Sequence, residues 1–193
     1  MRRNERNFKL AGILCAGACV LAAPARGAEP APNAAEILRA TAVEGGLIVH
    51  LGCGDGRLTA ALRTNEKYAV QGLTADAGQL AEARRRIAAL GLYGPVSVEL
   101  LGGDRLPYTD NLVNLVVADD PGLVPPTEIM RVLAPLGVAY VRAAERWEKI
   151  VKPRPKDIDQ WSHFLHDASN NAVALDARVG PPRTIQWVAP PLW

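Results

Sequence analysis

Residues 49–62 read VHLGCGDGRLTAAL. Three glycines alternate over five positions, at Gly52, Gly54 and Gly56, directly after an apolar run. A helical pattern begins at Leu58. Glycines in such a turn allow positive backbone φ angles and let a ligand approach the main chain. The start of the following helix supplies N–H groups that have no partner within the helix. The stretch therefore predicts a strand, a binding loop and a helix.

The sequence on both sides of this unit continues the alternation. Short apolar runs predict strands that are buried on both faces, at 47–51, 68–73, 96–100, 112–118 and 138–141. Helical patterns occur between them, at 34–42, 58–63, 77–90 and 127–133. Asn33 and Asp76 are the expected N-caps of the first and third helices. Strands that alternate with helices pair in parallel through right-handed crossovers. We therefore expect an α/β fold with a Rossmann-like, doubly wound and mostly parallel sheet.

The spacing of the glycines narrows the choice of ligand. A dinucleotide fingerprint has the form G-x-G-x-x-G/A. Gly52 and Gly54 fit that form, but Arg57 occupies its third position. The phosphate loop G-x-x-x-x-G-K-[ST] is absent from the sequence. The pattern that is present leaves another adenosine cofactor as the alternative to a dinucleotide.

Four segments, in order along the chain, resemble motifs of the class I S-adenosylmethionine-dependent methyltransferases. The glycine loop at 49–62 looks like the first motif, and 75–84 is similar to the segment after the second strand of the family. GDRLPY at 103–108 resembles the segment G-D-a-x-x-L-P-[FY]. EIMRVLAPLG at 128–137 resembles the helix and turn E-x-x-R-V-L-[KR]-P-G-G. The resemblance spans about Gly46 to Val141 and implies the methyltransferase fold with S-adenosylmethionine as cofactor.

The resemblance also implies roles for particular residues. The loop glycines would face the methionine part of the cofactor, and Thr74 would lie at the ribose hydroxyls. Asp104 would accept a hydrogen bond from the adenine amino group, and Arg105 would cover the ring. The expected cofactor contacts are therefore His50, Gly52, Cys53, Gly54, Gly56, Thr74, Asp104 and Arg105. Asp119 and Asp120 would border the reacting methyl group, so they are the candidate catalytic residues.

Three residues depart from the family pattern. His50 stands where the family usually has Asp or Glu, and Thr74 replaces an acidic residue that grips both ribose hydroxyls. Asn114 replaces the Asp before the fourth strand. Each hydrogen bond to a charged group contributes about 1.5–3 kcal/mol, so the loss of carboxylates weakens binding. In addition, nothing after Arg142 has the pattern of the two strands that complete the family sheet, and we expect the sheet to lack them.

The candidate residues also have simpler structural interpretations. We favour His50 as a hydrogen-bonded histidine at the end of a strand. Asp119 and Asp120 act either as a general base and a substrate contact or as polar residues that end a strand before a proline, and we favour the second. Cys53 fills a turn in our interpretation, because no base has an evident place beside it that would make it a nucleophile.

The segment after residue 142 has a different character. Residues 161–188, WSHFLHDASNNAVALDARVGPPRTIQWV, look like the opening of a PQQ-type (quinoprotein-like) β-propeller. A propeller needs several blades of four strands, so the expected partner is a propeller in a longer form of the protein. His163, His166 and Asp167 would begin a metal site if the segment were helical. A metal site needs three or four ligands, and we predict none.

The first 27 residues have the layout of a secretory signal peptide, with a basic start, an apolar run at 10–23 and small residues before the cleavage point. The run is shorter than the roughly 20 residues of a membrane span. We expect export to the periplasm or cell envelope and no stable membrane span after cleavage, with an uncleaved anchor as the alternative. The predicted organisation is a signal peptide (1–27), a lead-in with a helix (28–45), a methyltransferase-like domain (46–142) and a linker with a truncated propeller-like tail (143–193).

Two functions remain open from the sequence. The chain has 193 residues and a net charge of +2, which gives no reason to expect a nucleic-acid partner. The first function is methyl transfer from S-adenosylmethionine to an unknown small-molecule or protein acceptor. The alternative is a degenerate, non-catalytic methyltransferase module with a structural or interaction role in an exported propeller protein. The loop glycines and Asp104 favour the first function. The lost carboxylates and the predicted export favour the second, because S-adenosylmethionine is made in the cytosol.

Overall fold

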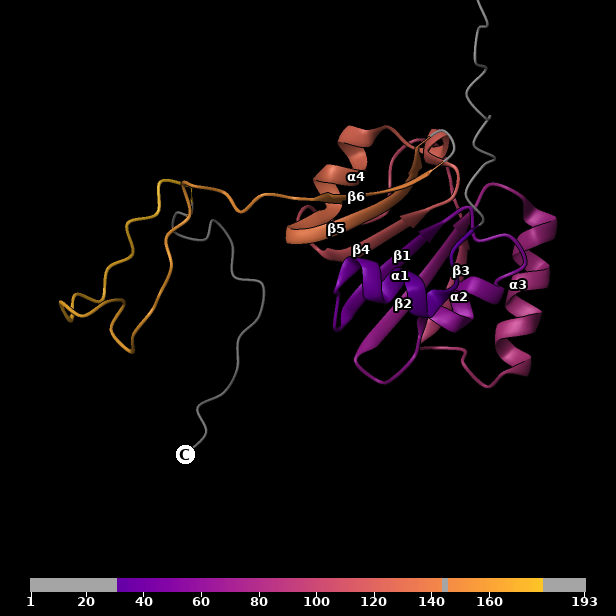
Figure 1. The fold of residues 1–193 in the computed structure, drawn as a ribbon, viewed down its shortest axis with the longest axis horizontal. Coiled ribbons are helices and arrows are strands. Elements are labelled where there is room, and N and C mark those ends of the chain that lie inside the picture. The colour runs from indigo at the N-terminus through magenta and orange to yellow at the C-terminus, as the bar shows by residue number, and fades with distance from the viewer. Residues whose placement is uncertain (1–30, 144–145, 179–193) are drawn as a thin grey trace, which may run out of the picture.

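The computed structural model describes residues 31–143 and 146–178. These residues form a sheet flanked by helices, and a C-terminal segment extends to one side (Figure 1). The signal peptide predicted at 1–27, and with it the expectation of export, lies outside the described residues. The same is true of residues 179–188, the second part of the stretch that resembles the opening of a propeller. Within the described ranges, no helix has the length and apolar character needed to cross a membrane.

The strands and helices follow the predicted alternation. The strands are β1 (Gly46–Leu51), β2 (Tyr68–Thr74), β3 (Val96–Leu100), β4 (Val113–Ala118), β5 (Leu133–Ala143) and β6 (Arg146–Val151). The helical segments are α1 (Ala34–Thr41), α2 (Arg57–Leu62), α3 (Ala77–Ala89), the 3-10 turn η1 (Pro121–Leu123) and α4 (Pro126–Val132). Asn33 and Asp76 are the N-caps of α1 and α3, as predicted. Each cap satisfies N–H groups that the first helical turn leaves unpaired.

The strand order is β3-β2-β1-β4-β5-β6. The first five strands in chain order pair in parallel, and β6 pairs antiparallel with β5. The chain moves outward from β1 in both directions, so the switch point lies between β1 and β4. Leu51 pairs with Ala118 there, at the carboxyl ends of the two strands. The predicted Rossmann-like, doubly wound and mostly parallel sheet is confirmed, and its ligand-binding edge is located.

One strand, β6, was not predicted, because the sequence after residue 142 has no apolar run typical of a strand. β6 pairs with β5 along its whole length, from Arg146 to Val151. Trp147 stacks on Tyr140 of β5 with ring centroids 5.2 Å apart. Lys149 donates a hydrogen bond to the carbonyl of Ala40, 3.0 Å away. The sheet therefore continues past the boundary that was expected at residue 142. We call residues 33–143 and 146–152 the sheet domain.

The sheet has an apolar layer on each face. The first layer packs the sheet against α1, α2 and α3, and its fully buried members include Ile37, Ile48, Leu62, Ile87 and Leu115. The second layer lies under α4, η1 and the connection between β3 and β4, and includes Leu51, Leu101, Leu106, Val116 and Ile129. We call that connection, residues 101–112, the β3–β4 loop. Among the residues that the structure describes, α4 is the only α-helix over this layer, and the β3–β4 loop supplies part of the core itself through Leu101 and Leu106.

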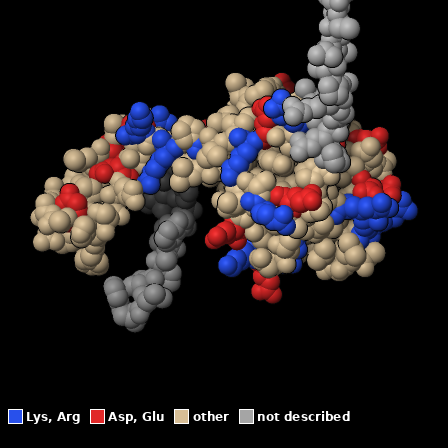
Figure 2. Space-filling model, viewed as in Figure 1, with Lys and Arg blue, Asp and Glu red and all other residues tan. Residues whose placement is uncertain are grey.

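The C-terminal segment, residues 157–178, is held by polar contacts instead, and we call it the tail segment. Its described residues form no helix or strand, apart from an isolated bridge between His163 and His166. The helix that would have aligned these two histidines for a metal is therefore not formed. Among the residues described, no group of three or more His, Cys, Asp or Glu could hold a metal ion. Figure 2 shows acidic and basic side chains interspersed on one face of both regions.

Candidate functional site

The glycine loop lies at the carboxyl end of β1, beside the switch point. Gly52, Gly54 and Gly56 have φ angles of +74°, +50° and +79°. The N–H groups of Gly52 and Cys53 both donate to the carbonyl of Leu73, at 2.8 and 3.1 Å. The N–H of Gly56 donates to the carbonyl of Cys53 at 2.9 Å. These bonds tie the loop to the end of β2 and fix its shape through contacts within the chain.

Two of the loop glycines have different surroundings. A Cβ on Gly56 would lie 2.9 Å from the Cβ of Ala83, so this glycine allows α3 to pack closely against the loop. A Cβ on Gly54 would meet no atom of the described residues within 4 Å. Gly54 therefore faces open space at the ligand-binding edge. At Gly56, packing against α3 accounts for the glycine.

His50 is buried in β1, and only 3% of its surface is exposed. Its Nδ1 atom lies 2.8 Å from the hydroxyl of Thr59 in α2. Burial lowers the pKa of His50 to about 4, although the nearby carboxylate of Asp119 acts in the opposite direction. The ring is therefore neutral at neutral pH and joins β1 to α2. This is the structural role that we favoured for it.

Thr74 ends β2 beneath the start of α3. Its hydroxyl donates to Oε1 of Gln79 at 3.1 Å and accepts from the N–H of Asp76 at 3.2 Å. The hydroxyl that was expected at the ribose therefore takes part in the turn into α3. Gln79 was not among the predicted site residues, and it brings an exposed amide to this position. Asn114 lies at the other end of the strands, near the start of β4, where its side chain accepts a hydrogen bond from the N–H of Leu47 near the start of β1.

Asp104 and Arg105 lie on the exposed part of the β3–β4 loop. The loop starts beside the end of β2, because the N–H of Leu101 donates to the carbonyl of Thr74 at 2.8 Å. Within the described part of the chain, neither Asp104 nor Arg105 makes a side-chain hydrogen bond or ion pair. Both side chains are therefore available to a ligand at the edge where the glycine loop lies.

The other candidate residues are engaged with the protein itself. Asp119 forms an ion pair of 3.1 Å with Arg142, and Asp120 accepts from the N–H of Gly122 as the N-cap of η1. These contacts support the interpretation of both aspartates as residues that end β4. Burial raises the pKa of the Cys53 thiol to about 11. The thiol stays protonated at neutral pH and is therefore a poor nucleophile.

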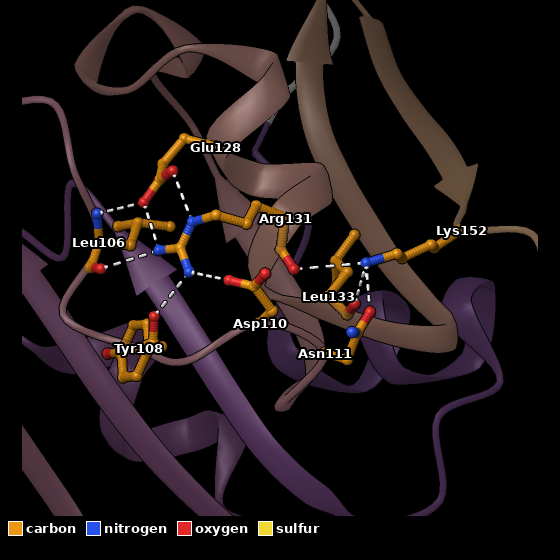
Figure 3. Close-up of polar contacts among 8 residues, drawn as sticks. All are labelled: Leu106, Tyr108, Asp110, Asn111, Glu128, Arg131, Leu133 and Lys152. Carbon is orange, nitrogen blue, oxygen red and sulfur yellow. Dashed lines mark hydrogen bonds and ion pairs between the residues drawn. The ribbon is translucent and has the colours of Figure 1, made fainter. Parts of the chain in front are cut away.

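A charged cluster that was not predicted from the sequence joins α4 to the β3–β4 loop (Figure 3). The guanidinium of Arg131 lies 2.6 Å from a carboxylate oxygen of Glu128 and 2.6 Å from one of Asp110. It also donates to the carbonyls of Leu106 and Tyr108, at 3.2 and 2.9 Å. Glu128 in turn accepts from the N–H of Leu106 at 2.7 Å. Hydrogen bonding from Arg131 is the main cause that lowers the pKa of Glu128 to about 2, so the carboxylate stays charged.

Two further side chains, Lys152 and Tyr108, hold the second half of the same loop. The ammonium of Lys152, just after β6, donates to the side chain of Asn111 and to the carbonyl of Leu133, at 2.7 Å each (Figure 3). The hydroxyl of Tyr108 donates to the side chain of Gln71 in β2 at 2.8 Å. The one sequence signal for this cluster was the pair Glu128 and Arg131, three residues apart and thus on one face of a helix.

Comparisons with known proteins agree with this architecture. Residues 48–137 match a family model described as a methyltransferase domain. No curated protein matches the chain. A candidate S-adenosyl-L-methionine-dependent methyltransferase from Methanococcus maripaludis aligns with a TM-score of 0.51 and 22% identity, over 56% of this chain and 52% of that one. The [4+2]-cyclase SpnF aligns with a TM-score of 0.51 and 24% identity, over 57% of this chain and 45% of its own.

A third structure is that of geranyl diphosphate C-methyltransferase from Streptomyces coelicolor, in complex with Mg2+, geranyl diphosphate and S-adenosyl-L-homocysteine. It aligns with a TM-score of 0.50 and 22% identity, over 55% of this chain and 43% of that one. The chain thus spans about half the length of the solved structures that it matches. At these identities the likeness concerns the fold, and one fold can host different reactions. The family match and the strand order together show that the chain contains a methyltransferase-like domain with a Rossmann-like fold.

Proposed function

We propose that this chain binds S-adenosylmethionine at the carboxyl edge of its sheet and transfers the methyl group to an acceptor. One observation carries the proposal. The loop after β1 at the switch point has three positive-φ glycines, and Gly54 faces open space there. The match to a methyltransferase family model over residues 48–137 supports it. So does the S-adenosyl-L-homocysteine bound to a protein of similar fold.

The residues present fit the methionine and adenine parts of this cofactor, but they fit its ribose less well. The open backbone at Gly54 lets the methionine end approach the start of α2. Asp104 would accept from the adenine amino group, and the flat guanidinium of Arg105 would cover the ring. At the ribose, the Thr74 hydroxyl is already engaged by Gln79 and Asp76. We therefore expect binding that is weaker than an acidic residue at this position would give.

When bound, the cofactor supplies an electrophilic methyl group. The residues of this chain would hold it against the acceptor in line, so that they contribute through proximity and orientation. Because Asp119 and Asp120 are tied to Arg142 and to η1, we assign neither as a general base. We therefore limit the acceptor to a small molecule or protein that reacts without help from these two carboxylates.

Calorimetric titration of S-adenosylmethionine, and then S-adenosylhomocysteine, into the purified chain tests the proposal. We expect micromolar binding that Gly54→Ala abolishes. Gly91→Ala is the matched control, because Gly91 also has a positive φ of +66° and open space around its Cβ position among the described residues. Gly91 lies between α3 and β3, at the amino ends of the strands and away from the glycine loop. Both variants carry the left-handed strain of about 1–2 kcal/mol, so a difference in binding between them reports the ligand.

The absence of heat at millimolar cofactor, from a chain that circular dichroism shows to be folded, would contradict the proposal. The non-catalytic module would then be the working description. Equal binding by Gly54→Ala and Gly91→Ala would place the cofactor away from the glycine loop.

A further inference from the structure

We infer that Arg131 and Glu128 are positioning residues, which hold the β3–β4 loop in the shape that presents Asp104 and Arg105 to the cofactor. Neither residue would touch the cofactor itself. The inference deepens the proposed function and rests on it for the identity of the ligand.

The cluster clamps one point of the loop from both sides. The N–H of Leu106 donates to Glu128, and the carbonyl of Leu106 accepts from Arg131. Arg131 also bonds directly to Glu128, at 2.8 Å from Nε and 2.6 Å from one terminal nitrogen, so the two side chains fix each other. Leu106 directly follows Arg105 and is itself buried. The clamp therefore lies one residue away from the expected adenine contacts.

The residues that precede the expected adenine contacts are less constrained. Gly102 and Gly103 precede Asp104, and a Cβ on either would meet no atom of the described residues within 4 Å. The whole β3–β4 loop contains no helix or strand. Leu101 anchors its start through β2, so the stretch from Gly102 to Arg105 is held at Leu101 and at Leu106. Releasing Leu106 would let this stretch move, and ordering it again would then oppose binding.

The geometry requires a guanidinium. Arg131 reaches two carboxylates and two carbonyls at once, which a planar fork with five donors can do and an ammonium on a flexible stem cannot. The two side chains are mostly shielded from water, with 21% of Arg131 and 13% of Glu128 exposed. Lysine at position 131 would keep the charge and the helix, yet it would lose most of the bonds to the loop.

The test compares the chain with its Arg131→Lys variant in two measurements. Hydrogen–deuterium exchange is followed in peptides that cover residues 101–112, and the affinity for S-adenosylmethionine is measured by calorimetry. We expect faster exchange in this loop and affinity that is weaker by about tenfold, as the loss of charge-assisted hydrogen bonds would cause.

Arg84→Lys is the matched control. Arg84 also bridges a helix to a strand, with bonds to the carbonyl of Val98 and to the carboxylate of Glu99, but it does not bond to the β3–β4 loop. The Arg84→Lys variant should leave both the exchange of residues 101–112 and the affinity for S-adenosylmethionine unchanged.

Each outcome decides the inference. If the chain binds the cofactor and Arg131→Lys binds it equally well, the inference is wrong. If the chain itself does not bind, the proposed function fails, and the exchange data still show whether Arg131 holds the loop. Unchanged exchange in Arg131→Lys would then overturn the positioning role as well.

Discussion

The sheet domain and the tail segment differ in the interactions that mainly stabilise them, and each contains a buried histidine that shows the difference. His50 lies in β1 with 3% of its surface exposed, and burial lowers its pKa to about 4. His166 in the tail segment is 5% exposed. Its Nε2 atom lies 2.6 Å from Asp159 and its Nδ1 atom 3.2 Å from Asp167, and the hydrogen bond with Asp159 is the main cause that raises its pKa.

The two regions accommodate a charged histidine ring differently. An apolar layer makes a charged ring costly, so His50 is neutral and needs one hydroxyl partner. Both ring nitrogens of His166 face carboxylate oxygens, and such a pair of acceptors suits the doubly protonated ring. The sheet domain is therefore stabilised mainly by its two apolar layers, to which the cluster around Arg131 adds, whereas ion pairs and hydrogen bonds hold the tail segment. Truncation of an apolar side chain and a change of pH should affect the two regions differently.

The largest expected effect comes from truncation in the core. Leu115 in β4 is fully buried, whereas Leu175 in the tail segment is 80% exposed. Leu115→Ala should lower the free energy of unfolding by about 2–5 kcal/mol, because it removes buried methyl groups and leaves a cavity. Leu175→Ala should change it by less than about 0.5 kcal/mol. Urea unfolding followed by circular dichroism measures both, and equal losses would refute the division between the regions.

The next effect is the acid sensitivity of the sheet domain. The pKa of His50 is depressed in the folded state, so stability is present above the ordinary value near 6.5 and is lost as the pH falls toward about 4. This histidine should account for roughly 3 kcal/mol over that window. His50→Asn keeps a polar atom near Thr59 but does not titrate. Urea unfolding at a series of pH values should show a shallower slope for the variant, and an unchanged slope would contradict the assignment.

The smallest effect on global stability is expected in the tail segment, where the sign is reversed. The pKa of His166 is raised, so its contribution is complete below pH 6.5 and is lost as the pH rises through the folded-state value. Other charged contacts in the segment are the bond from the N–H of Asp159 to Asp176 and the ion pair between Asp157 and Arg178.

Hydrogen exchange in residues 157–178, corrected for the intrinsic effect of pH, measures this loss. Protection of these amides from exchange should fall as the pH rises through the folded-state pKa of His166. In His166→Asn, this protection should be absent at all pH values. His163→Asn is the control, since His163 bonds to Ser162 and not to a carboxylate. Protection that increased with pH would show that His166 is not the charged centre of the segment.

Local patterns were sufficient for most of the sheet domain. The apolar runs predicted β1 to β5, and Asn33 and Asp76 were identified as N-caps, because periodicity and capping depend on neighbouring residues. β6 was missed because an edge strand need not be an apolar run. Its sequence, RWEKIV, mixes charged and apolar residues, and its assignment depends on pairing with β5.

The apolar runs and the spacing of the glycines were enough to predict the parallel α/β architecture and a glycine loop at the carboxyl ends of the strands. Which polar side chains remain available there depends on contacts between segments that are distant in the sequence. Thr74, Asp119 and Asp120 looked like site residues, yet each is engaged by the protein. Arg131 had no predicted role, and it bonds to loop residues that precede it by 21 to 25 positions. Hydrogen bonds need partners within about 3 Å, and only the packing of distant segments brings such partners together.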